Sequence, residues 1–136
     1  ETASHIQSQF HTDDRVIELD YGQWDGMALT DVPHDQWAQW RRDPSFRPPG
    51  GETLEELDAR VRPALEDLAD RARDEHVVIV SHVSPIKSAV TWALGTGPES
   101  TWRMHLDRAS ICRVAVTSRG ATLAGFNETG HLLPVG

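Results

Sequence analysis

A continuous apolar run near the middle of the chain limits most strongly what this sequence can fold into. Residues 76 to 81 are HVVIVS, which places four β-branched residues in a row. The alternation of apolar and polar residues that marks a strand with one solvated face is absent from this run. The run therefore predicts a central strand of a parallel sheet, buried on both faces.

Helices are predicted on both sides of this strand. Thr53 and Glu56 have the spacing of a capping box, and apolar residues recur at helical intervals after them, so we expect a helix over 53 to 74. Pro85 suits the first turn of a second helix, which Gly95 should end. The order helix, buried strand, loop, helix is typical of α/β folds.

The remaining segments fit into the same unit. Residues 1 to 10 are predicted as the tail of a helix, and 34 to 42 as a short helix whose two tryptophans either line a pocket or pack in the core. A loop rich in Pro and Gly follows over 43 to 51, and the pattern from 109 to 126 predicts an antiparallel hairpin. Because there is no linker or internal repeat, we expect one domain over residues 1–136.

Composition argues against several classes of protein. A formal net charge of −8 without a basic cluster disfavours nucleic-acid binding. No apolar stretch approaches the ~18 residues of a membrane span, and no signal-peptide pattern is present, so we expect a cytoplasmic protein without a membrane partner. Cys112 is the single cysteine, expected to be buried, which disfavours redox chemistry. His5 and His11 lie six apart without a ligand cluster, which leaves a metal-dependent hydrolase as a minor alternative.

Two residues stand where the predicted fold concentrates chemistry. His82 leaves the carboxyl end of the buried strand beside a helix N-terminus, where open α/β sheets bind anionic ligands. The alternative is an imidazole that only packs at the strand end. Glu18 ends a short apolar piece before the loop DYGQWDG and could protonate a leaving group, although a carboxylate in such a place is more often solvated. Turn and cap chemistry alone explains PGGET at 49 to 53.

Four motifs in this order resemble the histidine phosphatase superfamily, also called phosphoglycerate mutase-like. They are ETA at residues 1 to 3, Glu18 within ELDYGQWDG, PGGET, and VVIVSH ending at His82. SHVSPIK and HLDRASI are most similar to the alpha-ribazole phosphatase-like C-terminal domain of actinobacterial bifunctional ribonuclease H/acid phosphatases. The resemblance covers essentially the whole chain and implies a three-layer α/β/α fold with a mostly parallel sheet, its N-terminal strand and helix absent.

Carried onto this sequence, the resemblance implies hydrolysis of phosphomonoesters through a phosphohistidine, without a metal or cofactor. His82 would bind the phosphoryl oxygens together with the backbone N–H of Val83, and Glu18 would protonate the leaving alcohol. The expected partner is a small phosphorylated substrate, and a ribonuclease H domain could precede this one in a longer protein. The alcohol of the substrate and the oligomeric state stay open.

The nucleophile of that family has no counterpart in the chain. Family members attack phosphorus with the histidine of an Arg-His-Gly motif, and no Arg-His-Gly occurs in the 136 residues. Because ETA is similar to the end of an Arg-x-x-Glu-Thr motif, we expect an N-terminally truncated domain that lacks two βα units, about 60 residues. Such a chain is expected to be nearly inactive and to fold poorly. Phosphoglycerate mutase-type transfer and a non-catalytic phosphate-ligand binding module remain alternatives.

Overall fold

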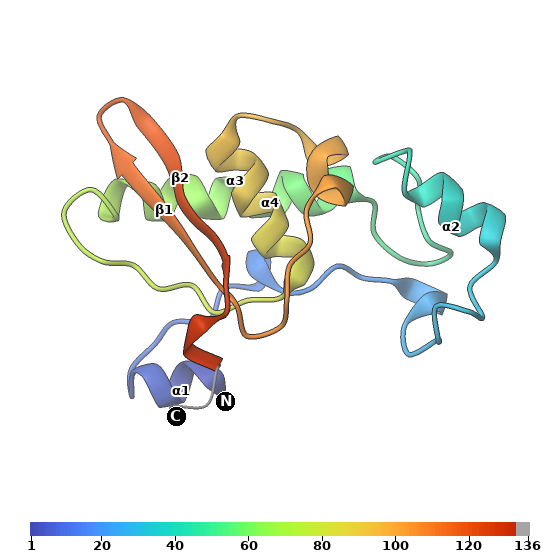
Figure 1. Cartoon of the computed structure of the whole chain (residues 1–136), viewed down its shortest axis with the longest axis horizontal. Helices are drawn as coiled ribbons and strands as arrows, with labels where there is room; N and C mark the ends of the chain where they lie inside the picture. Colours follow the sequence, from blue (N-terminus) through green and yellow to red (C-terminus); the bar gives the residue numbers. More distant parts are fainter. Residues whose placement is uncertain (133–136) are drawn as a thin grey trace.

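The hairpin and the two long helices pack together, and a small helical lobe extends from them. The computed structural model describes residues 1 to 132. Figure 1 shows α3 and α4 crossing beside the β-hairpin, with α2 at the far end of the long axis. The helices and strands are α1 (Thr2–Ile6), α2 (His34–Trp40), α3 (Leu54–Arg71), α4 (Val83–Leu94), β1 (Ile111–Thr117) and β2 (Gly120–Glu128). None of the helices in residues 1 to 132 combines the length and apolarity needed to cross a membrane.

Helix α3 begins where the capping box predicts. The Thr53 hydroxyl accepts from the Glu56 amide at 3.0 Å, and the Glu56 carboxylate accepts from the Thr53 amide at 2.9 Å. These reciprocal bonds satisfy two amides that a helix start leaves without partners. The helix ends at Arg71, three residues before the predicted end, and its buried face includes Leu57 and Val61.

Helix α4 crosses α3 and is tied to it by a buried polar contact. The Ser88 hydroxyl donates to the Asp58 carboxylate at 2.6 Å, and Asp58 also pairs with Arg62 on its own helix. The helix begins at Val83, two residues before Pro85. It ends, as predicted, at Gly95, whose φ of +67° is the left-handed conformation that glycine adopts at low cost. This crossing fixes the direction in which the N-terminus of α4 points.

The strand predicted at 76 to 81 does not form. These residues have no regular secondary structure, and Val78, Ile79 and Val80 are 67%, 40% and 42% exposed. A strand exists only through the ladder to a neighbour, and in residues 1 to 132 the one sheet is the pair β1 and β2. The segment runs between α3 and α4 as expected, but its apolar residues stay uncovered. Its last residue is anchored, because the Ser81 hydroxyl donates to the Val16 carbonyl at 2.6 Å.

The predicted antiparallel hairpin is confirmed. Strands β1 and β2 pair antiparallel from Thr117 opposite Gly120 to Ile111 opposite Glu128, and burial alternates along β1 and along the first half of β2. Two shifts of register lie between Ile111 and Val114, where the pairing is irregular. Cys112 is half-buried on β1 rather than fully buried as predicted. Both strands contact α4, so the hairpin supports the crossed helices from one side.

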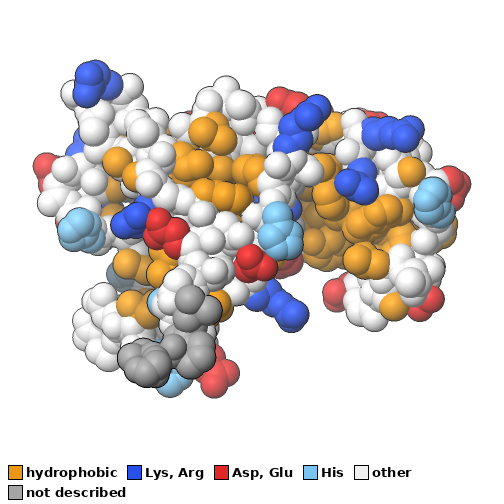
Figure 2. Space-filling model, viewed as in Figure 1, with side chains coloured by type: hydrophobic (Ala, Val, Ile, Leu, Met, Phe, Trp, Pro, Cys, Tyr) orange, Lys and Arg blue, Asp and Glu red, His pale blue; other side chains and the backbone are white. Residues whose placement is uncertain are grey.

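An aromatic cluster joins α2 to the rest of the molecule. Trp40 is 3% exposed and lies 4.7 Å from Trp102 and 5.8 Å from Tyr21, measured between ring centroids. Trp37 packs against the rings of Trp40 and Trp102, so both tryptophans of α2 pack in this cluster. Figure 2 shows hydrophobic side chains gathered between α2 and the crossed helices, with Lys and Arg along their border. The cluster therefore holds the loop after Glu18 beside α4.

Candidate active site

The Glu18 carboxylate lies at the N-terminus of α4. The side chain is half-buried, and its Oε1 accepts from its neighbouring amide, Leu19, at 2.8 Å and from the Ser84 amide at 3.2 Å. The Ser84 amide belongs to the first turn of α4, where exposed N–H groups favour negative charge. In the hydrogen bonds of the described residues, Oε2 accepts none. Glu18 is therefore not the solvated carboxylate that is more frequent in such a place. One of its oxygens is available to carry a proton.

His82 is the N-cap residue of the same helix. Its backbone is extended, with φ −118° and ψ 176°, and its exposed imidazole makes no capping hydrogen bond. The first-turn amides are already partly committed, because Ser84 donates to Glu18 and Pro85 has no N–H. The amide of Val83 is thus the one that the helix start leaves for a ligand. The structure brings together the three residues named from the sequence, Glu18, His82 and Val83.

A tyrosine and a lysine flank this helix start. The Tyr21 and Ser84 hydroxyls lie 3.2 Å apart, and burial raises the pKa of Tyr21. Lys87 is half-buried on α4, with Nζ 5.7 Å from the centroid of the Trp102 ring. Burial lowers the pKa of Lys87, while the nearby Glu18 carboxylate opposes that shift. Lys87 is therefore partly shielded from solvent, and it adds positive charge beside Glu18.

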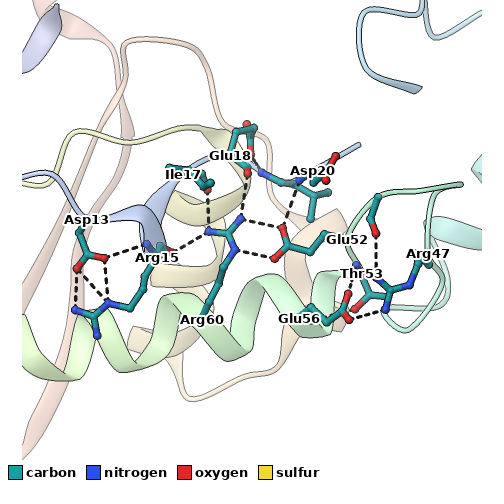
Figure 3. A network of polar contacts seen from close by, with 12 residues as sticks. Asp13, Arg15, Ile17, Glu18, Asp20, Arg47, Glu52, Thr53, Glu56 and Arg60 are labelled. Carbon is teal, nitrogen blue, oxygen red and sulfur yellow. Dashed lines mark hydrogen bonds and ion pairs between the residues drawn. The ribbon is translucent and has the colours of Figure 1, made fainter. Parts of the chain in front are cut away.

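A guanidinium holds the backbone that carries Glu18. Arg60, on α3, donates from Nε and Nη2 to the two oxygens of Glu52 at 2.7 and 2.8 Å (Figure 3). Its Nη1 donates to the carbonyls of Arg15 and Ile17 at 2.8 and 3.0 Å, and Nη2 donates to the Glu18 carbonyl at 3.0 Å. The sequence patterns did not predict this pair. Glu52 precedes the helix, so no helical spacing relates it to Arg60, and the three carbonyls carry no side-chain signal.

The PGGET loop and the loop after Glu18 meet backbone to backbone. The Glu52 amide donates to the Asp20 carbonyl at 2.8 Å. A Cβ on Gly51 would lie 2.5 Å from that same oxygen, and a Cβ on Gly22 would lie 2.4 Å from the Pro49 carbonyl oxygen. Gly22 also has a φ of +56°. Cap chemistry is therefore only part of the reason for the glycines, because they also allow two loops to touch where a side chain would separate them.

No metal cluster accompanies these residues. Within residues 1 to 132, no group of three or more His, Cys, Asp or Glu side chains is arranged to hold a metal ion. The charged groups close to the helix start are Glu18 and Lys87, and the arginine nearest in the network, Arg60, faces backbone carbonyls and Glu52. The arrangement can hold an anion at the N-terminus of α4 with a carboxylic acid beside it.

Two curated relatives match most of this chain. Bifunctional protein Rv2228c of Mycobacterium tuberculosis is 33% identical over 124 residues, which cover 88% of this chain and 34% of that protein. Phosphoserine phosphatase 1 of Hydrogenobacter thermophilus is 32% identical over 126 residues, which cover 88% of this chain and 59% of that protein. The chain therefore spans between a third and six tenths of the length of these relatives.

Solved structures show the same fold. A phosphoserine phosphatase variant from Entamoeba histolytica in complex with phosphoserine superposes with a TM-score of 0.85 at 23% identity, covering 97% of this chain and 70% of that one. The alpha-ribazole phosphatase from Shigella flexneri superposes with a TM-score of 0.75 at 22% identity, covering 92% and 64%. These likenesses confirm the predicted phosphoglycerate mutase-like α/β fold class.

A family model decides the wider relationship. The model described as the histidine phosphatase superfamily (branch 1) matches residues 1–129, nearly the whole chain. That span includes all four motifs on which the resemblance was drawn, from ETA to VVIVSH. Proteins named as phosphatases and as phosphoglycerate mutases are both among the relatives that match this chain. This chain belongs to the histidine phosphatase superfamily.

Proposed function

We propose that this chain is the C-terminal part, residues 1–136, of a histidine phosphatase domain that hydrolyses small phosphomonoesters without a metal ion. The observation that carries the proposal is the bond between the Glu18 carboxylate and the first turn of α4, immediately after His82. It joins a candidate acid to a candidate phosphate site. The two groups come from segments far apart in the sequence, and packing of the core alone does not require a carboxylate at this helix start.

The proposed reaction uses a histidine outside this chain as its nucleophile. That histidine attacks phosphorus, the P–O bond to the alcohol breaks, and Glu18 gives its proton to the departing oxygen. Water then attacks the phosphohistidine, with Glu18 taking the water's proton, and inorganic phosphate leaves. His82 and the Val83 amide hold the phosphoryl oxygens throughout, where negative charge builds up during the transfer. Glu18 ends each cycle protonated, ready for the next.

The residues of this chain support the acid role more fully than the phosphate role. Glu18 has one oxygen fixed by two amides and one available for a proton. His82 and the Val83 amide supply fewer donors than a phosphoryl group needs, and no arginine of the described contacts points to them. We propose that a preceding segment supplies the nucleophile and two arginines, and that this chain alone is nearly inactive.

The proposed substrate class is a small phosphorylated alcohol. It is supported by the relative named phosphoserine phosphatase and by the similar fold of a phosphatase bound to phosphoserine. The relative named a bifunctional protein supports a second domain in the complete protein, which we propose to be a ribonuclease H domain preceding this one. In that arrangement the phosphatase domain itself does not bind nucleic acid, in keeping with its net charge of −8.

The decisive experiment measures turnover by the protein expressed with the coding sequence that precedes Glu1. In the presence of EDTA it should hydrolyse p-nitrophenyl phosphate and phosphoserine and form an acid-labile phosphohistidine. His82→Ala should lose about a hundredfold or more in kcat/KM, as when an oxyanion contact is removed. Glu18→Gln should lose ~100- to 10,000-fold on phosphoserine, the range for a general acid.

A matched control is His76→Ala, which removes another exposed imidazole from the same segment. It should leave both kinetic constants within about twofold, as for a surface substitution away from the site. Activity that requires an added divalent metal, or full activity in His82→Ala, would contradict the proposal. A protein that binds phosphoserine without turning it over would instead favour the non-catalytic binding module.

A further inference from the structure

We infer that Arg60 is a positioning residue for the acid, and that it acts through the backbone of residues 15 to 18 with Glu52 as its counter-ion. The inference rests on the proposed role of Glu18 as proton donor. Arg60 makes no contact with the Glu18 carboxylate itself. It binds the carbonyl of Glu18 and two carbonyls just before it, so it fixes the main chain from which the acid projects.

All five guanidinium N–H groups are committed to protein acceptors. Nε donates to Glu52, Nη1 donates to Arg15 and Ile17, and Nη2 donates to Glu18 and Glu52. An arginine has five N–H donors in one plane, so none is left for a substrate oxygen. The side chains of Arg60 and Glu52 are 23% and 16% exposed. Arg60 is therefore suited to hold the protein together rather than to clamp a phosphate.

Other bonds also tie this segment to distant residues, from Ser81 to the Val16 carbonyl, from Arg15 to Asp67 and from Ser84 to the Glu18 carboxylate. Arg60 is the donor that binds its remaining carbonyls. The 3-10 turn Asp14–Val16 ends within this segment, and Ile17 is exposed. Three carbonyls of an irregular segment point to one side and converge on a single cation (Figure 3). Without the guanidinium these carbonyls would lose their shared donor, and the main chain could rotate. Misplacement of a reacting group by about 1 Å can cost a hundredfold in rate.

Glu52 links the guanidinium to the other side of the acid's loop. It binds Arg60 through both carboxylate oxygens, and its Oε2 lies 3.4 Å from the Asp20 amide. Its own amide donates to the Asp20 carbonyl. The pair therefore spans the main chain from residue 15 to residue 20, with Glu18 between the held ends. A lysine at position 60 would offer three donors without the planar fork, so it could not reproduce this pattern.

The test separates positioning from folding by the leaving group of the substrate. In the protein that carries the residues before Glu1, Arg60→Lys is assayed on p-nitrophenyl phosphate, whose phenolate departs without a proton, and on phosphoserine, whose alkoxide needs one. We expect kcat/KM on phosphoserine to fall about 10- to 100-fold, as for a displaced catalytic group. This constant reports the steps up to departure of the alcohol, so it excludes the later hydrolysis of the phosphohistidine, which both substrates share. On p-nitrophenyl phosphate the fall should be about threefold or less, because proton donation contributes little there.

The matched control is Arg62→Lys, two residues along the same helix. Arg62 also pairs with a carboxylate, that of Asp58, and with a carbonyl, that of Thr96, but it has no bond to residues 15 to 20. It should lose stability as Arg60→Lys does and keep the ratio of the two activities within about twofold. If Arg60→Lys does not fold, Glu52→Gln serves as the second variant, since it keeps the shape and removes the charge.

The outcomes decide between the inference and the proposed function. Selective loss on phosphoserine in Arg60→Lys or Glu52→Gln supports positioning. Equal loss on both substrates, or the same selectivity in Arg62→Lys, overturns it. If Glu18→Gln loses the same activity on both substrates, the proposed acid role fails, independent of the result for Arg60→Lys. A wild-type protein without phosphatase activity contradicts the proposed function before any variant is compared.

Discussion

The two halves of the candidate site are held in different ways. The loop that carries Glu18 is fixed by three hydrogen bonds from Arg60 to its carbonyls, by the amide contact from Glu52 and by the close approach of Gly51. The segment that leads to His82 is mostly exposed and unpaired, although it is more apolar. Apolar character alone therefore does not place a segment, because it needs a partner that covers it. Polar contacts to a formed helix place the less apolar loop.

The position of His82 depends on the helix that follows it. Because the residues before it form no strand, the imidazole is located by the N-terminus of α4 and by the Ser81 anchor to Val16. Helix α4 is located in turn by its buried bond to Asp58 on α3. The loop of Glu18 is also attached to α3, through the hydrogen bonds of Arg60. One crossing of two helices therefore sets the distance between the candidate acid and the candidate phosphate site.

The largest expected effect comes from disrupting the contact between the PGGET loop and the loop after Glu18. In Gly51→Ala the new methyl group would meet the Asp20 carbonyl at 2.5 Å, and a backbone atom cannot move aside as a side chain can. We expect a loss of about 3 kcal/mol in the free energy of unfolding, the upper range for overpacking. Denaturant unfolding monitored by tryptophan fluorescence would measure it, since the aromatic cluster lies beside this loop.

The control for that contact between loops is Gly26→Ala. Gly26 also belongs to the loop after Glu18, with a φ of +73°, but nothing lies within 4 Å of a Cβ built on it. Only the left-handed backbone would cost energy there, about 1 kcal/mol. A loss in Gly51→Ala no larger than that in Gly26→Ala would contradict the argument that the contact between the loops requires glycine at position 51.

A smaller effect, which depends on pH, tests the start of α3. The Arg47 guanidinium, and then the Thr53 amide, lower the pKa of the Glu56 carboxyl from 4.5 to about 2. Because the pKa is lower in the folded protein, Glu56 stabilises the fold above pH 4.5, and this contribution is lost as the pH falls toward 2. Glu56→Gln should therefore unfold at a lower temperature than wild type at pH 6, and the two melting temperatures should converge near pH 2.

Thr53→Ala is the companion variant, because a hydroxyl does not titrate in this range. It should cost about 1 kcal/mol, the usual value of a helix cap, at every pH between 3 and 7. A gap between Glu56→Gln and wild type that stays constant with pH would contradict the ionic part of the cap. A gap that closes for Thr53→Ala as well would point to a general acid effect on the protein.

What the sequence predicted well was local. The cap at Thr53, the stop at Gly95 and the hairpin each depend on neighbours within a few residues, so their patterns can be read along the chain. His82, Val83 and Glu18 were found through motifs, and the structure brings them together. The metal-free, cofactor-free mechanism assigned to them stays a prediction.

What could not be predicted depends on partners distant in sequence. The run 76 to 81 has the composition of a central strand. A strand also needs a neighbouring strand to pair with, and no local sequence pattern specifies that neighbour. Arg60 was missed because its acceptors are main-chain carbonyls, which every residue has. The close approach of Gly51 to Asp20 was likewise hidden, because a glycine before a cap already has a sufficient local explanation.

The smallest expected effect sharpens the comparison on the His82 side. Ile79 is 40% exposed, so Ile79→Thr should change the stability of this chain by less than about 0.5 kcal/mol. Val61→Thr, at a fully buried position of α3, should cost about 1–3 kcal/mol for burying a hydroxyl. If a preceding segment covers residues 76 to 80 in the complete protein, the cost of Ile79→Thr measured there should rise toward that of Val61→Thr, because the same hydroxyl would then lose water. An equally small cost in the complete protein would mean that the apolar run stays open to solvent, and that α4 and the Ser81 anchor hold His82 without a strand.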